Sequence, residues 1–215
     1  MKRKINLEKV LAMMLILTQG VQLPPNGENH LLDQALAQAG LSIDGYVVSG
    51  YVHLERGGLY VLEKMLQTRL NTGDNTLLFR GEELKVVLAD NKGKAVSMQL
   101  ITTDEQKAHY CRSFWQFFAD NWGKGEIMGI TVLAKAYEEM SLSAEEKFCA
   151  EIAGFLDAEG MVYKNGGGVD GVYYSSKLAK GLSVAAQEIN YNIVLRPHAG
   201  RTDVYLGYPV IYQTY

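Results

Sequence analysis

The spacing of apolar residues predicts alternating helices and strands in the first half of the chain. Helical spacing recurs in three segments, the first of which ends at Gly40, a residue typical of helix ends. β-Branched and aromatic residues mark the strands between them. In chain order we predict a helix over 31–39, a strand over Ser42–Leu54, a helix over 59–70, strands over Thr76–Ala89 and Ala95–Thr102, and a helix over Thr103–Asn121.

The second half repeats this order of strand, helix and further strands. Ser143 and Glu146 have the spacing of a capping box at a helix start, and Gly160 is the expected stop. Gly166-Gly167-Gly168 is expected to be a hairpin loop. The predicted elements are a strand over Ile127–Ala136, a helix over Ser143–Ala158, and strands over Met161–Lys164, Val172–Ser176, Glu188–Arg196 and Thr202–Tyr212.

This order predicts an α+β fold. Strands that mostly follow one another favour antiparallel pairing over a doubly wound parallel sheet. Because the strand, helix and strands arrangement occurs twice, we expect two similar subdomains with packed helices, over residues 28–122 and 126–215. The break falls at Trp122-Gly123-Lys124-Gly125.

The first 23 residues have the order of a secretory leader. Lys2, Arg3 and Lys4 precede an uninterrupted apolar run over 10–17, and Pro24-Pro25 separates this segment from the rest. The run is shorter than the roughly 20 residues that cross a bilayer. We therefore expect residues 1–23 to be a signal peptide or a membrane anchor, with an amphipathic first helix as the other interpretation. The predicted location is extracytoplasmic, secreted or membrane-anchored.

Composition and charge narrow the classes of function. The chain has 215 residues, 47% of them hydrophobic, which excludes a disordered protein. Its formal net charge is −3. Removal of residues 1–23 takes away four basic residues and one acidic residue and leaves −6. An acidic domain attracts neither phosphate backbones nor anionic lipids, so nucleic acid is not an expected partner.

The usual catalytic and metal-binding motifs are not found in the sequence. The histidines are scattered, without the spacing of a zinc site, and the glycine loop lacks the residues of a phosphate-binding loop. Cys111 and Cys149 lie on apolar sides of predicted helices, where buried free thiols and one disulfide both remain open. We assign no catalytic, cofactor-binding or metal-ligating residue and expect no cofactor. The histidines are His30, His53, His109 and His198.

Carboxylate pairs and aromatic residues are the remaining candidates. Three pairs, Glu82-Glu83, Glu138-Glu139 and Glu145-Glu146, could serve a hydrolase only if the fold held two carboxylates across a groove. The helix over Thr103–Asn121 and the residue just beyond it carry many aromatic rings, either buried on both sides or exposed for a ligand. Its aromatic residues are Phe114, Trp115, Phe117, Phe118 and Trp122, and further tyrosines are Tyr191, Tyr205, Tyr208, Tyr212 and Tyr215.

Four segments resemble the YwmB-like proteins of Gram-positive bacteria. Tyr191–Arg196 and Asp203–Tyr215 are similar to the end of that family, with its final strand carrying a glycine, a proline and a terminal tyrosine. Ser42–Tyr46 and Met98–Thr103 are similar to earlier strands, and the leader also fits. The resemblance implies a two-subdomain α+β fold and an export signal. The family's label, "TATA-box binding", implies a likeness in fold.

These observations predict a class of function without naming a reaction. We expect a non-enzymatic binding or assembly protein of the bacterial cell envelope, whose partner is a protein, a peptide or a glycan. The alternatives are a hydrolase that acts on envelope polymers through a carboxylate pair, and a nucleic-acid binder like the TATA-binding proteins. The acidic charge and the leader disfavour the last of these.

A fusion of residues 1–30 to a reporter that is active only outside the cytoplasm tests export. The basic start followed by the apolar run predicts reporter activity. A fusion in which Lys2, Arg3 and Lys4 are replaced by Glu is the control and is expected to lose activity. A silent reporter on the unaltered segment would contradict the prediction.

Overall fold

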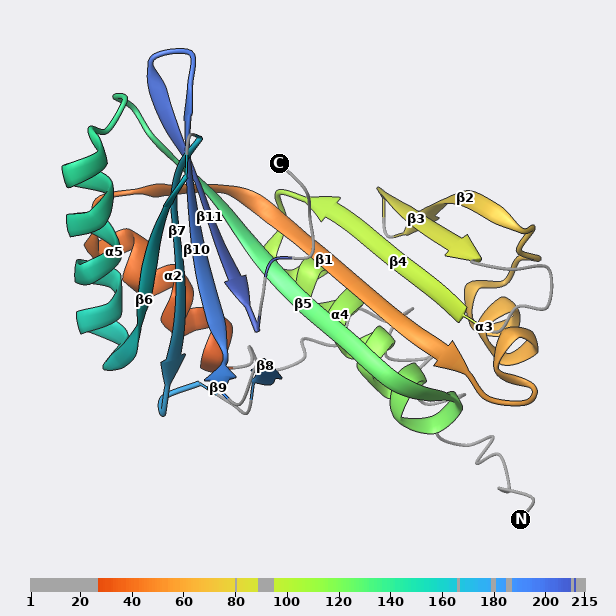
Figure 1. The fold of residues 1–215 in the computed structure, drawn as a ribbon. Coiled ribbons are helices and arrows are strands. Elements are labelled where there is room, and N and C mark those ends of the chain that lie inside the picture. Colours follow the sequence, from red (N-terminus) through yellow and green to blue (C-terminus); the bar gives the residue numbers. More distant parts are fainter. Residues whose placement is uncertain are drawn as a thin grey trace.

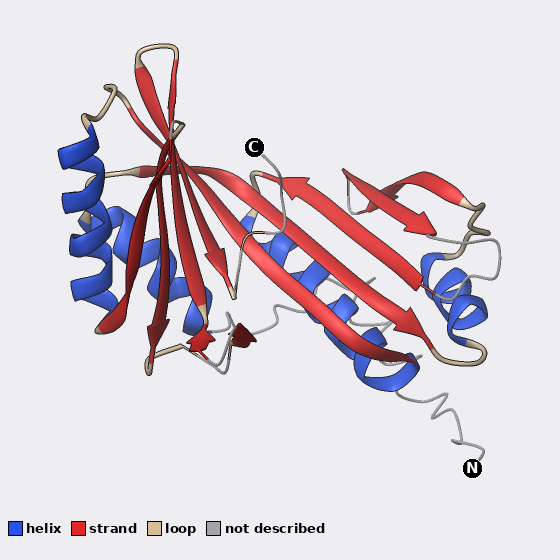
Figure 2. Ribbon diagram, viewed as in Figure 1, coloured by secondary structure: helices blue, strands red, loops and turns tan. Residues whose placement is uncertain are grey.

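One large antiparallel sheet and four helices make up most of the described chain (Figures 1 and 2). The structure is a computed structural model that describes residues 27–79, 81–88, 95–165, 167–178, 181–184, 187–209 and 211. The elements are α2 (Gly27–Gln38), β1 (Ser42–Leu54), α3 (Gly58–Leu66), β2 (Gly73–Phe79), β3 (Glu82–Leu88), β4 (Ala95–Thr102), α4 (Glu105–Trp122), β5 (Gly123–Ala136), α5 (Leu142–Leu156), β6 (Ala158–Asn165), β7 (Gly168–Ser175), β8 (Leu182–Val184), β9 (Gln187–Ile189), β10 (Tyr191–His198) and β11 (Arg201–Tyr208).

The nine-stranded sheet has the order β2-β3-β4-β1-β5-β11-β10-β7-β6, and every neighbouring pair is antiparallel. The predicted α+β class with a mostly antiparallel sheet is therefore confirmed. Each half of the chain supplies one half of the sheet with the same topology. A long strand, β1 or β5, leads through a helix to the far edge, and the following strands return to the long strand. A short β8–β9 hairpin lies outside the main sheet.

The seam between the two halves is the pairing of β1 with β5. Their register runs from Ser42 opposite Lys135 to Leu54 opposite Gly123, with two irregularities. Helix α4 packs on β1, β4 and β5, and α2 contacts β1, β5 and α5. Thus α2, which lies in the predicted first subdomain, also packs against a helix of the second. Since α4 ends at Trp122 and β5 begins at Gly123, the predicted break lies at a direct helix-to-strand junction.

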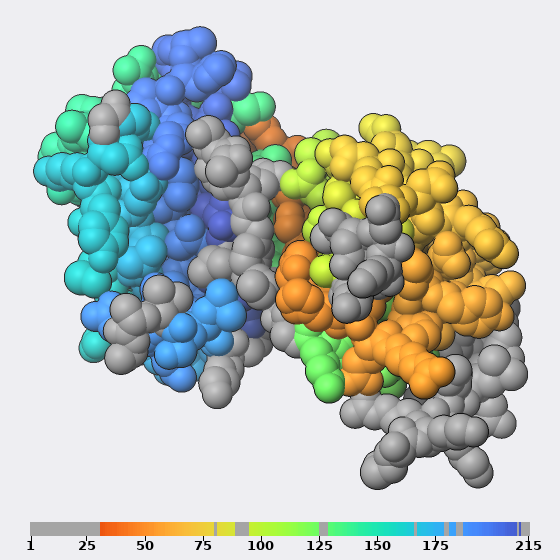
Figure 3. All heavy atoms as spheres, turned by 45° about the vertical axis from the view of Figure 1, so that its right-hand side comes forward, coloured from red at the N-terminus to blue at the C-terminus, as the bar shows by residue number. Residues whose placement is uncertain are grey.

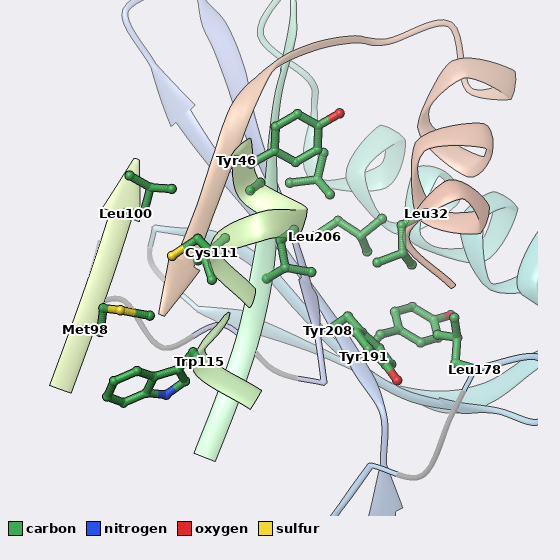
Figure 4. Close-up of a cluster of buried hydrophobic side chains, with 14 of the residues drawn as sticks. Leu32, Tyr46, Met98, Leu100, Cys111, Trp115, Leu178, Tyr191, Leu206 and Tyr208 are labelled. Atoms are coloured by element: carbon green, nitrogen blue, oxygen red, sulfur yellow. The ribbon is translucent and has the colours of Figure 1, made fainter. Parts of the chain in front are cut away.

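A single hydrophobic core extends across the seam on the helix side of the sheet (Figure 4). Trp115 and Cys111 of α4 lie over Met98 and Leu100 of β4, and the core continues past Tyr46. It also includes residues of the second half, among them Leu206, Tyr191 and Tyr208, and Leu32 of α2. The guanidinium of Arg112 lies over the Tyr208 ring, 4.8 Å from its centroid, which adds a further contact between the halves.

Most predicted elements are confirmed, but two predicted strands are each divided in two. The strand predicted over Glu188–Arg196 is divided between β9 of the small sheet and β10 of the main sheet. The predicted strand over Thr76–Ala89 is wrong as well. The structure has two strands there, β2 and β3, paired as a hairpin in which Phe79 lies opposite Glu82. Gly81 lies in the turn with φ 88°, a left-handed conformation that favours glycine. In the sequence, the dipeptide Arg80-Gly81 is a two-residue turn signal set within a mostly apolar run, which made one long strand the expected element.

The predicted ends of the helix over Ser143–Ala158 are also corrected. Ser141 caps α5, because its side chain accepts a hydrogen bond from the backbone N–H of Ala144. The helix ends at Asp157, whose φ of 51° is left-handed, so Gly160 does not stop it. The final strand ends at Tyr208, short of the predicted Tyr212.

The predicted leader, residues 1–23, lies outside the described residues. No helix in the described part of the chain is long and apolar enough to span a membrane.

Replacing Gly50 with alanine is expected to destabilise the protein by about 3 kcal/mol, because overpacking a core typically costs about 1 to 3 kcal/mol or more. A Cβ atom at this β1 position would overlap the indole of Trp115. Gly154→Ala in α5 is the matched control, since nothing lies within 4 Å of the added atom. It is expected to stabilise by about 0.5 kcal/mol. Denaturant unfolding measures both, and equal stabilities for the two variants would contradict the packing described.

Candidate functional site

The four helices of the described chain contribute side chains to one core on the same side of the sheet, and none of these helices covers the other side (Figures 1 and 2). Side chains alternate between the sides along each strand, so Val48 and Val52 face the core while Ser49 and Tyr51 face away. We call this second surface the open face. Its residues include Val47, Ser49, Tyr51 and His53 on β1, Lys85 and Val87 on β3, Ser97, Gln99 and Ile101 on β4, Thr131, Leu133 and Lys135 on β5, Asn192, Val194 and Arg196 on β10, Tyr205 on β11, Asp170, Val172 and Tyr174 on β7, and Met161 and Tyr163 on β6.

The chain itself covers part of the open face after the last strand. The backbone N–H of Ile211 donates to Oδ1 of Asn192 at 2.7 Å. The side chain of Ile211 lies where a Cβ of Gly207 would be, so the missing side chain of Gly207 allows this close approach. The open face near β10 and β11 is thus partly occupied from within the chain.

A hollow of about 340 Å³ lies on the open face in the first half of the sheet. In Figure 3 the strands of this half lie in the lobe coloured orange to yellow-green. Two rows of side chains cross its floor. Ser49, Gln99 and Lys85 lie opposite one another on β1, β4 and β3, and Tyr51, Ser97 and Val87 form the next row. Directly opposite residues have Cβ atoms about 5 Å apart, so each row is continuous.

The hollow offers hydrogen-bonding groups beside one aromatic ring. Within the described chain, the side chains of Ser49, Ser97 and Gln99 make no hydrogen bond, so their donors and acceptors are available to a ligand. The ammonium of Lys85 lies 2.8 Å from a carboxylate oxygen of Asp74, which balances its charge. Tyr51 packs edge-on against His53, with ring centroids 5.2 Å apart. This set suits an uncharged polar ligand, such as a sugar or a peptide group.

A second hollow, of about 470 Å³, lies along α3 and the residues that follow it. It is lined by the single segment between Tyr60 and Arg69, with Lys64 placed over the Tyr60 ring. Since only one segment forms it, no other element fixes the spacing of its polar groups. The hollow on the open face, which is built by three paired strands, is therefore the better candidate site.

The structure does not bring the histidines together. His53 lies on the open face beside Tyr51, His109 is buried 3.3 Å from Glu105, and His198 is exposed at the end of β10. The side chain of His30 lies outside the described residues. The described residues include no group of three or more His, Cys, Asp or Glu side chains that could hold a metal ion. The glycine loop joins β6 to β7 in a hairpin, as predicted. Gly166 itself is not among the described residues.

None of the three predicted carboxylate pairs lines a hollow of the described chain, although Glu139 lies near enough to Glu145 to help raise its pKa. Glu82 is bound to Lys107 at 2.9 Å, whereas its neighbour Glu83 lies on an exposed position of β3. Glu145 is fully buried under α5, and Glu146 binds Lys164 at 2.9 Å. Of the two hollows, the one on the open face is lined by no carboxylate and the other by Glu63 alone.

Both cysteines are free, buried thiols. The disulfide left open by the sequence is not present; Cys111 lies in α4 and Cys149 in α5. Burial raises the pKa of the Cys149 thiol to about 12, against a smaller lowering by a hydrogen bond with Tyr173. Burial also raises the pKa of Cys111. Both thiols therefore stay protonated at neutral pH and are poor nucleophiles.

The aromatic residues of α4 are core residues. Phe114, Trp115 and Phe118 are buried, and Phe117 and Trp122 pack partly buried against the same core. The exposed aromatic patch considered for this helix is therefore absent. Exposed aromatic side chains occur instead at Tyr60 and Tyr137 and, on β6 and β7, at Tyr163 and Tyr174. Tyr191 and Tyr208 are buried, and Tyr212 and Tyr215 lie outside the described residues.

Comparison with known proteins adds no relative: no protein-family model matches the chain, and neither does any curated protein.

The sequence analysis did not predict the hollow residues Ser49, Ser97 and Gln99. Their polar side chains alternate with Val48, Met98 and Leu100, and this alternation was the available signal. The sequence did not show that β1, β4 and β3 are neighbours in that order.

Glu145→Gln is expected to stabilise the protein at pH 8 by roughly 1 kcal/mol or more, because glutamine carries no charge and burial penalises the ionised carboxylate that it replaces. Glu145 is fully buried, and within the described chain neither of its carboxylate oxygens has a hydrogen-bond partner. Burial raises its pKa above the ordinary 4.5, although Arg196 acts in the opposite direction. The folded protein therefore keeps this proton to a higher pH than the unfolded chain, and stability falls as pH rises from about 4.5 towards the folded pKa.

Denaturant unfolding from pH 4 to pH 8 measures this effect. The difference between Glu145→Gln and the unaltered protein should grow with pH across this range. Glu146→Gln is the matched control, because that neighbouring carboxylate is partly exposed and paired with Lys164. It is expected to change stability by less than about 1 kcal/mol. A pH-independent difference for Glu145→Gln would contradict the assignment.

Proposed function

We propose that this protein is an exported, non-enzymatic binding or assembly protein of the bacterial cell envelope, similar to the YwmB-like proteins. The observation that carries the proposal is the hollow on the open face. On a broad sheet surface that none of the described helices covers, hydroxyl, amide and ammonium groups lie around Tyr51. Such a surface can bind a polar polymer, a peptide or a glycan, without performing chemistry on it.

The chemistry of the hollow supports binding over hydrolysis. Glycoside hydrolysis uses two carboxylates roughly 5 to 10 Å apart across a cleft. The hollow contains none, and its one ammonium is paired with Asp74. Ser49 and Ser97 lack a histidine partner within the described chain, since His53 lies against Tyr51. A hydrolase that uses a carboxylate pair therefore has no comparable support.

The charges of the open face also argue against nucleic acid as a partner. TATA-binding proteins place basic side chains and inserted aromatic wedges on a concave sheet. Here Lys85 is paired with Asp74 at 2.8 Å, and Arg196 with Asp170 at 2.7 Å. Each cation is thus balanced by a neighbouring carboxylate. The likeness implied by the label is accordingly one of fold, while the partner that we propose is an envelope component.

Filling the hollow should abolish binding to envelope material. The full chain is immobilised and incubated with solubilised envelope from Gram-positive bacteria, and the retained peptides and glycans are identified. Ser97→Trp places an indole on the floor of the hollow and is expected to reduce specific retention about tenfold, a change of about 1.4 kcal/mol. Ser143→Trp, at an exposed position of α5, is the control and should retain the same components as the unaltered chain.

Equal retention by Ser97→Trp and the unaltered chain would contradict the role of the hollow. Retention of nothing specific by the unaltered chain would contradict the binding function itself. Turnover of an envelope polymer by the purified protein would favour the hydrolase instead.

We expect no affinity for duplex DNA at physiological salt and micromolar protein. The acidic net charge and the paired cations leave no field to attract phosphates, and even six phosphate contacts would require six suitably placed cations. A mobility-shift assay with A·T-rich and G·C-rich duplexes measures this. A salt-dependent shift that is stronger for the A·T-rich duplex would contradict both this expectation and the envelope role.

A further inference from the structure

The two ends of the main sheet differ in how their edge strands are protected. An edge strand exposes unpaired backbone N–H and C=O groups, and proteins usually protect it with charges, prolines, bulges or a cover. Strand β2 forms one edge and β6 the other. On β2 two of the three exposed positions are polar, Asp74 and Thr76, and the third is Leu78. The Asn75 side chain also donates to the backbone carbonyls of Asn71 and Gly73.

Strand β6 carries little of this protection. It is exposed from Glu159 to Asn165, contains no proline, and pairs with β7 without a register shift (Figure 1). Its centre is apolar, with Met161 44%, Val162 38% and Tyr163 49% exposed. The one lysine, Lys164, is bound to Glu146 of α5 and so does not project freely along the edge. A regular, apolar and exposed edge of this kind is a surface on which a further strand can add.

We propose that β6 pairs with β6 of a second copy of this chain, antiparallel and centred on Val162. This interaction goes beyond the proposed function and uses a different surface. In an isologous pair the same strand meets itself, so each residue before the centre faces a residue equally far beyond it. Centring on Val162 places Met161 opposite Tyr163 twice, Glu159 opposite Asn165 twice and Gly160 opposite Lys164 twice.

The side chains of β6 complement one another in this register. A methionine sulfur against an aromatic ring is a favourable contact, and the pair occurs twice. Glu159 faces Asn165, whose amide donates to Asp170 at 2.6 Å and has a second hydrogen for the carboxylate. Gly160 has no side chain to displace Lys164 from Glu146. No two like charges face each other, which is the electrostatic condition for self-pairing.

Centring on Met161 is less favourable. That register places Glu159 opposite Tyr163 and Gly160 opposite Val162, so Val162 has no side chain to pack against. It also moves Asn165 away from the Glu159 carboxylate of the other copy, so its amide does not donate a hydrogen bond to that carboxylate. Of these two registers, the one centred on Val162 is therefore the one that the side chains favour.

This pairing has a consequence for binding. The two-fold axis lies perpendicular to the sheet, so the open faces of both copies lie on the same side. Two hollows would then face one polymer, and a repeating envelope polymer could engage both, which raises its apparent affinity without any new contact.

Cysteine crosslinking of the full chain tests the register. In Val162→Cys the two introduced thiols are directly opposite, within the range of Cα separations that a disulfide spans, about 4.4 to 6.8 Å. Mild oxidation should therefore give a covalent dimer. Met161→Cys is the matched control, because its opposite residue is Tyr163, and it should crosslink poorly. The native Cys111 and Cys149 are buried and do not interfere. Crosslinking of Met161→Cys in preference to Val162→Cys would overturn the register.

Light scattering after size-exclusion chromatography tests the dimer itself over a concentration series. The unaltered chain should give a dimer mass, and Tyr163→Lys should raise the dimer dissociation constant about tenfold or more, because it replaces two cross-strand contacts with charges. Leu78→Lys on β2, where the leucine is 82% exposed, is the control and should leave the dimer unchanged. A monomer at all concentrations, an assembly larger than a dimer, or an equal effect of both variants would overturn the proposal.

Discussion

The antiparallel pairing of β1 with β5 is the constraint on which the rest of the structure depends. These two long strands lie at the centre of the sheet, and each also pairs with a strand of its own half, β4 or β11. Their alternating residues, including Val48 and Ile130, place one apolar surface under α4. Since α4 packs across both strands, the two halves share one core. The close approach of Trp115 to Gly50 fixes the position of α4 on this seam.

Placing every described helix on one side determines what the other side can do. The open face keeps the polar alternate residues of the same strands, and three paired strands hold Ser49, Gln99 and Lys85 in one row. The backbone hydrogen bonds between the strands set the spacing of these three side chains, so their positions do not depend on hydrogen bonds among the side chains themselves. Within the described residues, the hollow has fixed hydrogen-bonding groups but neither a pair of carboxylates nor a serine hydrogen-bonded to a histidine, which agrees with the binding role that we propose.

The sequence predicted what depends on local pattern. The strand Ser42–Leu54 was predicted with its observed bounds, and the helix over Thr103–Asn121 differs by one or two residues at each end. The turn at Gly81 and the cap at Ser141 are local signals that the prediction missed. At each place the sequence offers an equally plausible alternative: a continuous strand through Gly81, and Ser143 as the cap. The hollow could not be predicted, because cross-strand neighbours depend on sheet order, which non-local packing decides. The burial of Glu145 likewise depends on where α5 packs, and its sequence position resembles an ordinary exposed helix start.

Native-state hydrogen exchange over a denaturant series tests most directly whether the β1–β5 seam makes the two halves one cooperative unit. Protected amides of β1 and β4 in one half, and of β10 and β11 in the other, should converge on a single opening free energy equal to that of global unfolding. The contradicting result is that the amides of residues 142–208 open together at a distinctly lower free energy while those of β1 and β4 stay protected. The two halves would then be separate folding units, and the seam would not join them into one.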